Sequence, residues 1–359
     1  MIRYEAPSLA FRYQFDAPLI SGSVKLPVSG GMFYAQSIEQ LAVIEMSAVR
    51  MVLTAFVVSC INDVRASAWL AASTDFLGPL RGLLYPALSL RTVQLFNLRQ
   101  QELELKRDEF FNHLRHQFYL SKGLSTRQRL EVALHHHDYE FSRYSDAYRA
   151  QVYRNSGLIL WQTDVDGKHF CIRLTASRDL SWEGDLSVIL YADGARLCTM
   201  SFTYVDASLF GAGSTPMMFV TRNQSDPHKP EQQLFRQRFR HTTPPYFCLA
   251  AIFAIAQANG MDSIAAVRHQ SQIACTPDNQ AVLKNSYDEF WRAFRATELD
   301  EQSFVLPVPM TLTPLSELKA KHRGRAVERR KAWSEVSISA SAVMAELQTA
   351  LDSGPDRSS

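Results

Sequence analysis

The residues of this sequence that most readily suggest chemistry are three consecutive histidines and an aspartate, His135-His136-His137-Asp138. Imidazole and carboxylate groups are common ligands of transition metals, so a metal site is the first hypothesis. Successive residues of a helix point about 100° apart, so three consecutive histidines cannot share one ion. At best, one of them pairs with a ligand distant in the sequence. We therefore predict no metal, and we expect Arg129 and one of the histidines to hold the helical part of the chain against a sheet.

Cysteine and serine chemistry find little support. The five cysteines are odd in number and far apart, with no CxxC or Cys/His zinc spacing, which argues against a disulfide framework. No Gly-x-Ser-x-Gly elbow occurs in the chain, so a Ser/His/Asp triad has no sequence signature here.

Charge and hydropathy exclude further classes. Lys and Arg number 38 against 36 Asp and Glu, a net charge of +2, so we predict no extended contact with nucleic acid. The most apolar window, residues 41–61, contains Glu45 and Arg50, and we predict no transmembrane segment. The first residues show no secretory signal, so we expect a cytoplasmic protein. The oligomeric state cannot be read from the sequence.

The predicted secondary structure, which must position any site, changes near Gly157 from mainly helical to mainly β-strand. We predict an α+β protein in four parts: an extended arm at 1–35, an α-helical region at 36–155, an α+β domain at 156–312, and a basic C-terminal helix with a frayed tail at 313–359. In the second part, apolar residues recur at helical spacing, and Ser125 is a candidate N-cap for a helix beginning at Thr126.

The third part begins with four segments rich in β-branched and aromatic residues. Asp-Gly pairs at 166–167 and 193–194 suit tight hairpins, which predicts an antiparallel meander. A fifth strand at 217–222, a helix at 244–259 and a buried parallel strand at 263–269 follow. A helix at 281–297 and an extended segment from Phe304 complete the domain.

Several motifs of this chain resemble the bacterial VirK/YbjX family over residues 76–336. They are Arg129 with the histidine cluster, Trp182-Glu-Gly-Asp-Leu-Ser187, Phe202, Val267-Arg-His-Gln-Ser-Gln-Ile273, Tyr287-Asp-Glu-Phe-Trp291, Phe304-Val-Leu-Pro307 and the terminal Lys/Arg helix. The sequence departs from the family at Val220–Gln224 and His241–Tyr246, so a family site in those segments would be altered here. The resemblance implies a Gram-negative protein associated with virulence and envelope stress, without an agreed catalytic mechanism.

The predicted order of elements also resembles that of the GNAT acyltransferase superfamily. In those enzymes two neighbouring strands splay, and the pantetheine of an acyl-CoA occupies the gap. The pyrophosphate lies on the N-terminus of the following helix. The resemblance implies that the strands at 217–222 and 263–269 splay, and that the helix from Pro244 receives the phosphates.

The resemblance places a phosphate-binding corner before Pro244. Thr242 or Thr243 would cap the helix, and Arg222, Arg236 and Arg240 would contact the phosphates of an acyl-CoA or another phosphate-bearing small molecule. The alternative is that Thr-Thr-Pro-Pro is only a good helix start and that the arginines, Arg238 among them, lie in a solvated loop. The chain has no Gly-rich loop here, which counts against a pyrophosphate.

Two side chains are candidates for proton transfer. His241 adjoins the corner and could act as a general base. Tyr287 begins the helix that in GNAT enzymes supplies a tyrosine near the acyl-CoA sulfur, where it could protonate the leaving thiolate. Its spacing with Phe290 and Trp291 also describes an aromatic stripe that faces a core.

Two functions stay open. One is an acyltransferase that uses an acyl-CoA donor, and the other is a non-enzymatic binding or adaptor protein that keeps the fold without a working cofactor site. Seven Lys and Arg residues between Lys319 and Lys331 could contact a membrane surface, RNA or a CoA phosphate, or could form a solvated helix face.

Overall fold

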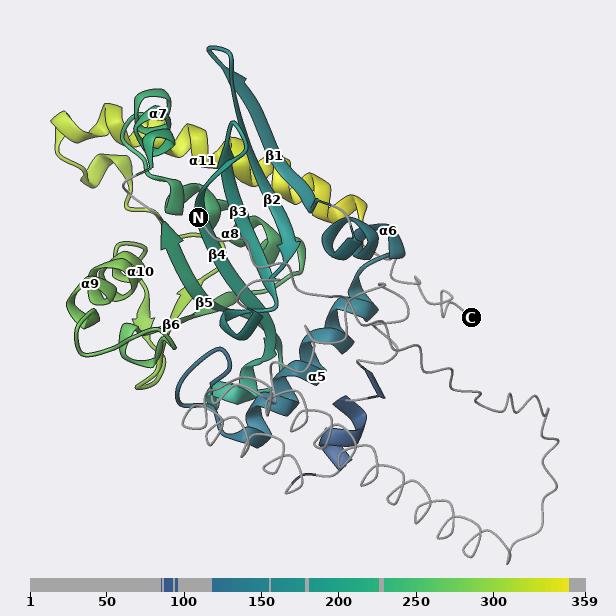
Figure 1. Ribbon diagram of the computed structural model, residues 1–359. Coiled ribbons are helices and arrows are strands. Elements are labelled where there is room, and N and C mark those ends of the chain that lie inside the picture. The colour runs from purple at the N-terminus through teal and green to yellow at the C-terminus, as the bar shows by residue number, and fades with distance from the viewer. Residues whose placement is uncertain are drawn as a thin grey trace, which may run out of the picture. The chain divides into compact units, whose positions relative to one another are not determined.

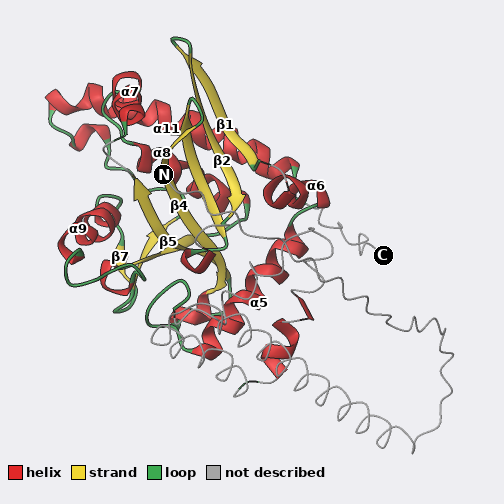
Figure 2. Cartoon of the chain, viewed as in Figure 1, coloured by secondary structure: helices red, strands yellow, loops and turns green. Residues whose placement is uncertain are grey.

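The computed structural model describes residues 118–154, 156–177, 181–225 and 229–348, together with 85, 87–92 and 94–95 (Figure 1). The predicted arm at 1–35, the helical pattern at 37–72 and the tail beyond 348 lie outside the described residues. The rest confirms the α+β class, with helices flanking a mostly antiparallel sheet (Figure 2).

Helix α5 (Thr126–Arg143) begins as the sequence predicts. The Ser125 hydroxyl accepts the Gln128 N–H, and the Gln128 side chain accepts the Ser125 N–H, which is a complete capping box. Helix α5 continues without interruption through the histidine cluster to Arg143. The short helix α6 (Asp146–Arg149) and a π-helical turn, η2 (Ala150–Arg154), then lead into the sheet.

The sheet has eight strands in the order β1-β2-β3-β4-β5-β6-β8-β7. Their bounds are Leu158–Val165 (β1), Lys168–Ala176 (β2), Leu186–Ala192 (β3), Ala195–Asp206 (β4), Pro216–Ser225 (β5), Ser263–Val267 (β6), Thr297–Glu298 (β7) and Ser303–Pro307 (β8). All neighbouring strands are antiparallel except β5 and β6, which are parallel. Along the chain, the antiparallel meander, the fifth strand, the helix and the parallel strand follow one another in the order that the sequence analysis predicts.

The parallel pair requires a crossover, which α8 (Pro244–Ala258) supplies. Helix α8 is buried along most of its length because the sheet covers one side and the long helix α11 (Ala320–Glu346) packs on the other. Helix α7 (Pro230–Arg238) precedes it, so the arginine-rich loop expected there is largely helical. None of the helices within the described ranges is long and apolar enough to cross a membrane.

A group of short elements follows β6. They are η5 (His269–Ser271), α9 (Gln280–Lys284), the π-helical turn η6 (Asn285–Glu289) and α10 (Phe290–Arg292). The helix predicted at 281–297 is therefore divided by a π-turn and ends earlier. Figure 1 shows these elements beside the end of the sheet formed by β5 and β6.

Candidate functional site

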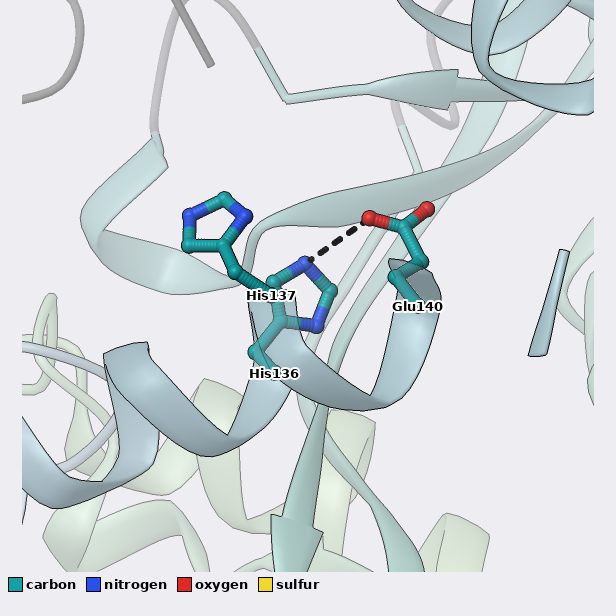
Figure 3. Close-up of side chains that lie close together, drawn as sticks. All are labelled: His136, His137 and Glu140. Carbon is teal, nitrogen blue, oxygen red and sulfur yellow. Dashed lines mark ion pairs between the residues drawn. The ribbon is translucent and has the colours of Figure 1, made fainter. Parts of the chain in front are cut away.

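The histidine cluster lies on the buried side of α5 (Figure 3). Ligand atoms of His136, His137 and Glu140 all fall within 4.8 Å of one another. The carboxyl group that faces His136 is that of Glu140, four residues further along the same helix. The Glu140 carboxyl also accepts the Tyr153 hydroxyl at 2.5 Å.

The hydrogen bonds of His136 argue against a metal at this cluster. Its Nδ1 accepts the backbone N–H of Tyr204 in β4, at 3.3 Å. A neutral imidazole then carries its proton on Nε2, which faces Glu140 Oε2 at 3.6 Å. A metal bound to Nε2 would move the imidazole proton to Nδ1. That N–H would then face the Tyr204 N–H, and two donors cannot form a hydrogen bond with each other. His136 therefore joins α5 to β4, and Arg129 is buried in the same helix.

The more distinctive site begins at an irregularity in β5. Ser201 of β4 pairs with Arg222, but the next residue, Phe202, pairs with Val220, so Thr221 is an extra residue in β5. Such a bulge bends its strand and increases its twist. Pairing between β5 and β6 ends at the same point, with Val220 and Ala266. β5 thus continues beyond its last pair with β6, which itself ends at Val267, and we call the region beyond that pair the β5–β6 opening.

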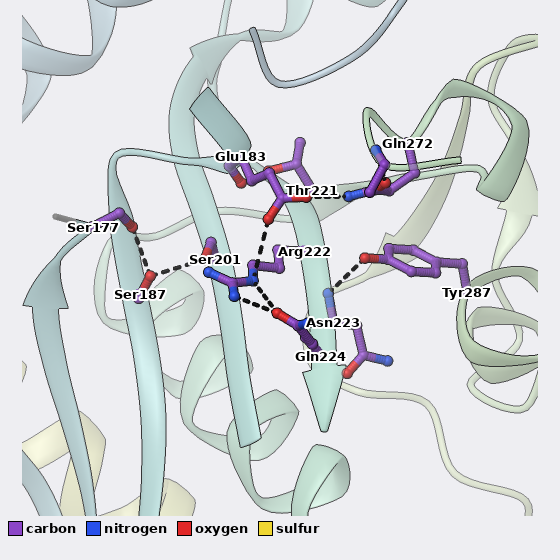
Figure 4. A network of polar contacts seen from close by, with 11 residues as sticks. Ser177, Glu183, Ser187, Ser201, Thr221, Arg222, Asn223, Gln224, Gln272 and Tyr287 are labelled. Atoms are coloured by element: carbon purple, nitrogen blue, oxygen red, sulfur yellow. Dashed lines mark hydrogen bonds and ion pairs between the residues drawn. The ribbon is translucent and has the colours of Figure 1, made fainter. Parts of the chain in front are cut away.

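Glu183 and Arg222 meet beside the β5–β6 opening (Figure 4). Glu183 Oε2 lies 3.2 Å from Arg222 Nε, and the side chains are 8% and 10% exposed. Gly184 makes this approach possible, because its φ of 138° is unfavourable for other residues. A Cβ there would lie 2.9 Å from the Phe202 nitrogen. Burial lowers the pKa of Arg222, and neighbouring Glu183 opposes that shift.

Further polar groups complete the network around this ion pair. Gln272 donates its amide to Glu183 Oε1 at 2.7 Å, and the Thr221 hydroxyl donates to the Glu183 carbonyl at 2.5 Å. The Tyr287 hydroxyl accepts the Asn223 N–H at 3.1 Å, and Asn223 Nδ2 donates to the Ser286 carbonyl at 2.9 Å. Residues of η6 thus contact the edge of β5 that β6 leaves free.

A buried His–Asp pair lies next to this network. His269 begins η5, two residues after the end of β6, and Asp288 comes from η6. Nδ1 of His269 lies 2.9 Å from Asp288 Oδ2, and its backbone N–H donates to Oδ1 at 2.9 Å. The two side chains are 5% and 2% exposed. The π-helical turn explains why Tyr287 and Asp288, adjacent in sequence, both point inward: extra residues in a turn redirect side chains, often at functional sites.

Of the predicted site residues, the structure brings Arg222 and Tyr287 into the opening. Arg222 is paired with Glu183 and also donates to the Gln224 side-chain oxygen at 3.0 Å. Burial raises the pKa of Tyr287. A phenol with a raised pKa is a weaker acid, which disfavours the predicted role of proton donor to a thiolate.

The predicted phosphate corner lies before α8 instead. Thr243 is the N-cap, but its side chain makes no capping bond, and the Thr242 hydroxyl accepts the indole N–H of Trp333 at 3.0 Å. Pro244 and Pro245 have no N–H, and the N–H of Tyr246 donates to the Thr243 carbonyl at 3.0 Å. The first turn of α8 therefore offers a phosphate none of the free backbone donors that such a site needs.

The remaining predicted residues are separate from the opening's network. Arg236 and Arg240 are exposed, and Arg238 pairs with Asp166. His241 Nε2 lies 3.8 Å from Glu328 of α11. Sequence reasoning missed Glu183, His269 and Asp288 as site residues, although all three lie in motifs that carry the family resemblance. The sequence signal for His269 was its position two residues after a buried parallel strand, because ligand sites of α/β sheets lie at that end of the strands.

One protein-family model matches most of the chain. The model for DUF535, a protein of unknown function, matches residues 69–339. The chain belongs to the DUF535 family. DUF535 is the VirK/YbjX family, so the resemblance inferred from the motifs is confirmed. No curated protein matches this DUF535 member.

One solved structure is similar, a mutant of a cAMP-binding acyltransferase from Mycobacterium smegmatis. The match has 14% sequence identity and a TM-score of 0.25, and it covers 60% of this chain and 62% of that chain. At that score the likeness supports no conclusion about activity.

Proposed function

We propose that this DUF535 protein is an acyltransferase whose reaction centre lies at the β5–β6 opening, with His269 as general base. The observation that carries the proposal is the buried pair of His269 and Asp288, 2.9 Å apart, at the end of β6 where β5 bends away. A histidine oriented by a carboxylate is the arrangement that activates nucleophiles in many unrelated enzymes. The Tyr287 and Arg222 side chains line the same opening.

The chemistry follows from the tautomer that Asp288 selects. With Nδ1–H donated to Asp288, the Nε2 lone pair of His269 accepts a proton from an amine or hydroxyl acceptor. The acceptor then attacks the carbonyl carbon of a thioester, which forms a C–N or C–O bond. The C–S bond breaks, and the leaving thiolate takes the proton back from His269. One proton therefore passes from acceptor to thiol, and the enzyme returns to its starting state.

We propose an acyl-CoA as the donor, held differently from the arrangement expected from the sequence. The first turn of α8 lacks free N–H groups, so phosphates would have to be bound by side chains. Arg236 and Arg240 are exposed near this turn and are available for that role. A cytoplasmic location and a link to virulence or envelope stress belong to the same proposal, as expectations of the family resemblance.

A second candidate is the non-enzymatic binding or adaptor protein. The contacts across the opening favour it: Tyr287 occupies the Asn223 N–H, Asn223 reaches the Ser286 carbonyl, and Arg222 is neutralised by Glu183. A donor would have to displace some of these contacts in order to enter.

Calorimetry with acetyl-CoA and a long-chain acyl-CoA, combined with a thiol-release assay over a panel of amines and alcohols, distinguishes the two candidates. The enzyme hypothesis predicts binding, and release of free CoA that falls at least about a hundredfold in His269→Gln and Asp288→Asn. The matched controls are His169→Gln and Asp164→Asn, because that pair has the same 2.9 Å contact on the exposed hairpin of β1 and β2. Absence of both heat and thermal stabilisation with either acyl-CoA would remove the acyltransferase and leave the binding protein.

A further inference from the structure

The hydroxyl of Tyr287 has a hydrogen that no residue uses. Its oxygen accepts the Asn223 N–H at 3.1 Å, and among the residues that the structure describes none accepts the hydroxyl hydrogen in return. Tyr287 is 3% exposed, so bulk water does not satisfy this group. A buried donor without an acceptor is costly, and it calls for a partner that the described chain does not supply.

Tyr287 differs in this respect from the other side-chain donors beside the Glu183–Arg222 pair (Figure 4). Each of those already donates to an oxygen of the protein, and they are Thr221, Arg222, Asn223 and Gln272. The bond of Tyr287 to β5 uses its oxygen instead. Acceptance of the Asn223 N–H also polarises the hydroxyl, which makes its hydrogen a stronger donor.

The π-helical turn η6 holds this hydroxyl and the His–Asp pair together. Tyr287 and Asp288 are consecutive, so their Cα atoms are about 3.8 Å apart, and both are buried. Asp288 bonds to His269, two residues beyond β6, and Tyr287 bonds to Asn223, on the part of β5 that has no partner in β6. One turn therefore contacts the chain on both sides of the β5–β6 opening.

We propose that Tyr287 is a second catalytic residue, whose hydroxyl donates a hydrogen bond to the carbonyl oxygen of the acyl donor. This inference rests on the proposed acyl transfer at the β5–β6 opening. When the acceptor attacks the carbonyl carbon, an electron pair of the C=O bond moves to the oxygen, and it returns when the C–S bond breaks. Tyr287 stabilises that negative charge and keeps its own proton, since the one proton that moves passes through His269.

Burial suits Tyr287 to this role. It raises the pKa of the phenol, which therefore stays protonated over the pH range in which an imidazole titrates. Such a group gives up its proton reluctantly but always has a hydrogen to donate. A fixed donor in a site from which water is excluded stabilises a developing charge more than the same donor does in water.

The first test is infrared spectroscopy of bound acetyl-CoA that carries ¹³C at the thioester carbonyl. The full chain is used with His269→Gln, which prevents turnover. We expect the carbonyl stretch at a lower frequency than in free acetyl-CoA, because a hydrogen bond to the oxygen weakens the C=O bond. Tyr287→Phe should return the stretch to the free value, whereas 3-fluorotyrosine at position 287, a more acidic phenol, should lower it further.

The second test is kinetic and uses the chain with His269 intact. Tyr287→Phe should lower kcat about a hundred- to a thousandfold with little change in KM for acetyl-CoA. The pH at which activity is lost on acidification should stay the same, because a displaced His269 would move it.

The matched control is Tyr144→Phe. The Tyr144 hydroxyl is also buried and also accepts an N–H, from Asn259 Nδ2 at 2.6 Å, but it lies between α5 and the end of α8. Its loss should lower stability and leave both the carbonyl stretch and kcat unchanged.

The two proposals fail in different ways. If acetyl-CoA binds but its carbonyl stretch is that of the free thioester, or shifts equally with and without the Tyr287 hydroxyl, the role of Tyr287 is overturned and acyl transfer stands. If acetyl-CoA does not bind at all, both are overturned. Should Tyr287→Phe fail to fold, the 3-fluorotyrosine protein decides, because an unchanged stretch there overturns the role of Tyr287.

Discussion

Arg222 Nε lies 3.2 Å from Glu183 Oε2, directly after the extra residue that bends β5, and both side chains are about nine-tenths buried. The pair joins the β5 bulge to the turn before β3, so it ties two irregular parts of the sheet together. A buried charge that loses its partner is strongly destabilising, because water no longer reaches it.

Arg222→Met should therefore lower the free energy of unfolding by about 3–5 kcal/mol, because it leaves the Glu183 carboxylate buried without its cation. Urea denaturation followed by circular dichroism measures this. Arg238→Met is the control, since Arg238 pairs with the exposed Asp166 and its loss should cost about 1 kcal/mol or less. Equal losses in the two variants would contradict a buried pair.

Gly184→Ala should be severely destabilising. The residue has a φ of 138°, and a Cβ would meet both the Phe202 nitrogen and the Ser201 Cβ at 2.9 Å. Gly194→Ala provides the comparison: its φ of 79° is also positive, but nothing lies within 4 Å of its Cβ position. We expect only the backbone cost there, about 1 kcal/mol, and a clearly lower melting temperature for Gly184→Ala. Similar melting temperatures for both variants would show that the close approach at Gly184 is wrong.

Two tyrosines near Glu140 should respond oppositely to removal of the hydroxyl. The Tyr148 hydroxyl is buried with no hydrogen-bond partner in the described part of the chain, so Tyr148→Phe should leave stability unchanged or raise it by about 1 kcal/mol. Tyr153 donates to Glu140 at 2.5 Å, so Tyr153→Phe should lower stability by about 1–3 kcal/mol. Thermal or urea unfolding of both variants checks the contrast, which fails if Tyr148→Phe is the more damaging change.

Alkaline pH should unfold the protein as its buried tyrosines ionise. Burial raises the pKa of Tyr139 to about 12, and it also raises the pKa of Tyr144 and Tyr204. In the unfolded chain these groups lose their protons near pH 10. The stability they contribute is therefore complete below about pH 10 and is lost as pH rises toward 12. Tyrosinate absorbance should rise together with loss of the circular dichroism signal. Full titration of the tyrosines in a chain that stays folded would contradict the prediction.

Much of the fold could be predicted from local chemistry. Asp166-Gly167 and Asp193-Gly194 adopt the positive φ angles that tight hairpins need, and the Ser125 capping box marks the start of α5. The strand, helix and parallel strand at β5, α8 and β6 were also predicted, because a continuous apolar run is typical of elements buried on both sides.

The site was harder to predict, for physical reasons. Glu183 and Arg222 are far apart in the sequence, and only the β5 bulge and the turn at Gly184 bring them together. A bulge leaves no clear pattern in a strand where nearly every residue is buried, as in β5. For the phosphate corner, by contrast, the sequence did contain the decisive information. Pro244 and Pro245 lack N–H groups, so two backbone donors are missing, but the prediction considered these prolines only as a helix start.

The extra residue in β5 has a consequence for how this sheet could change by mutation. Along β4, Tyr204 pairs with Met218 and Phe202 pairs with Val220, but Met200 pairs with Asn223. Because of the extra residue Thr221, the paired positions of β5 change from even-numbered to odd-numbered residues there. Loss of that one codon would leave every other pair with β4 in place and restore plain alternation. β5 would then run straight, and its pairing with β6 would extend to Val267, the last residue of β6. A single in-frame deletion therefore separates the bulged sheet from a regular one, and the same deletion would remove the Thr221 hydroxyl that donates to the Glu183 carbonyl.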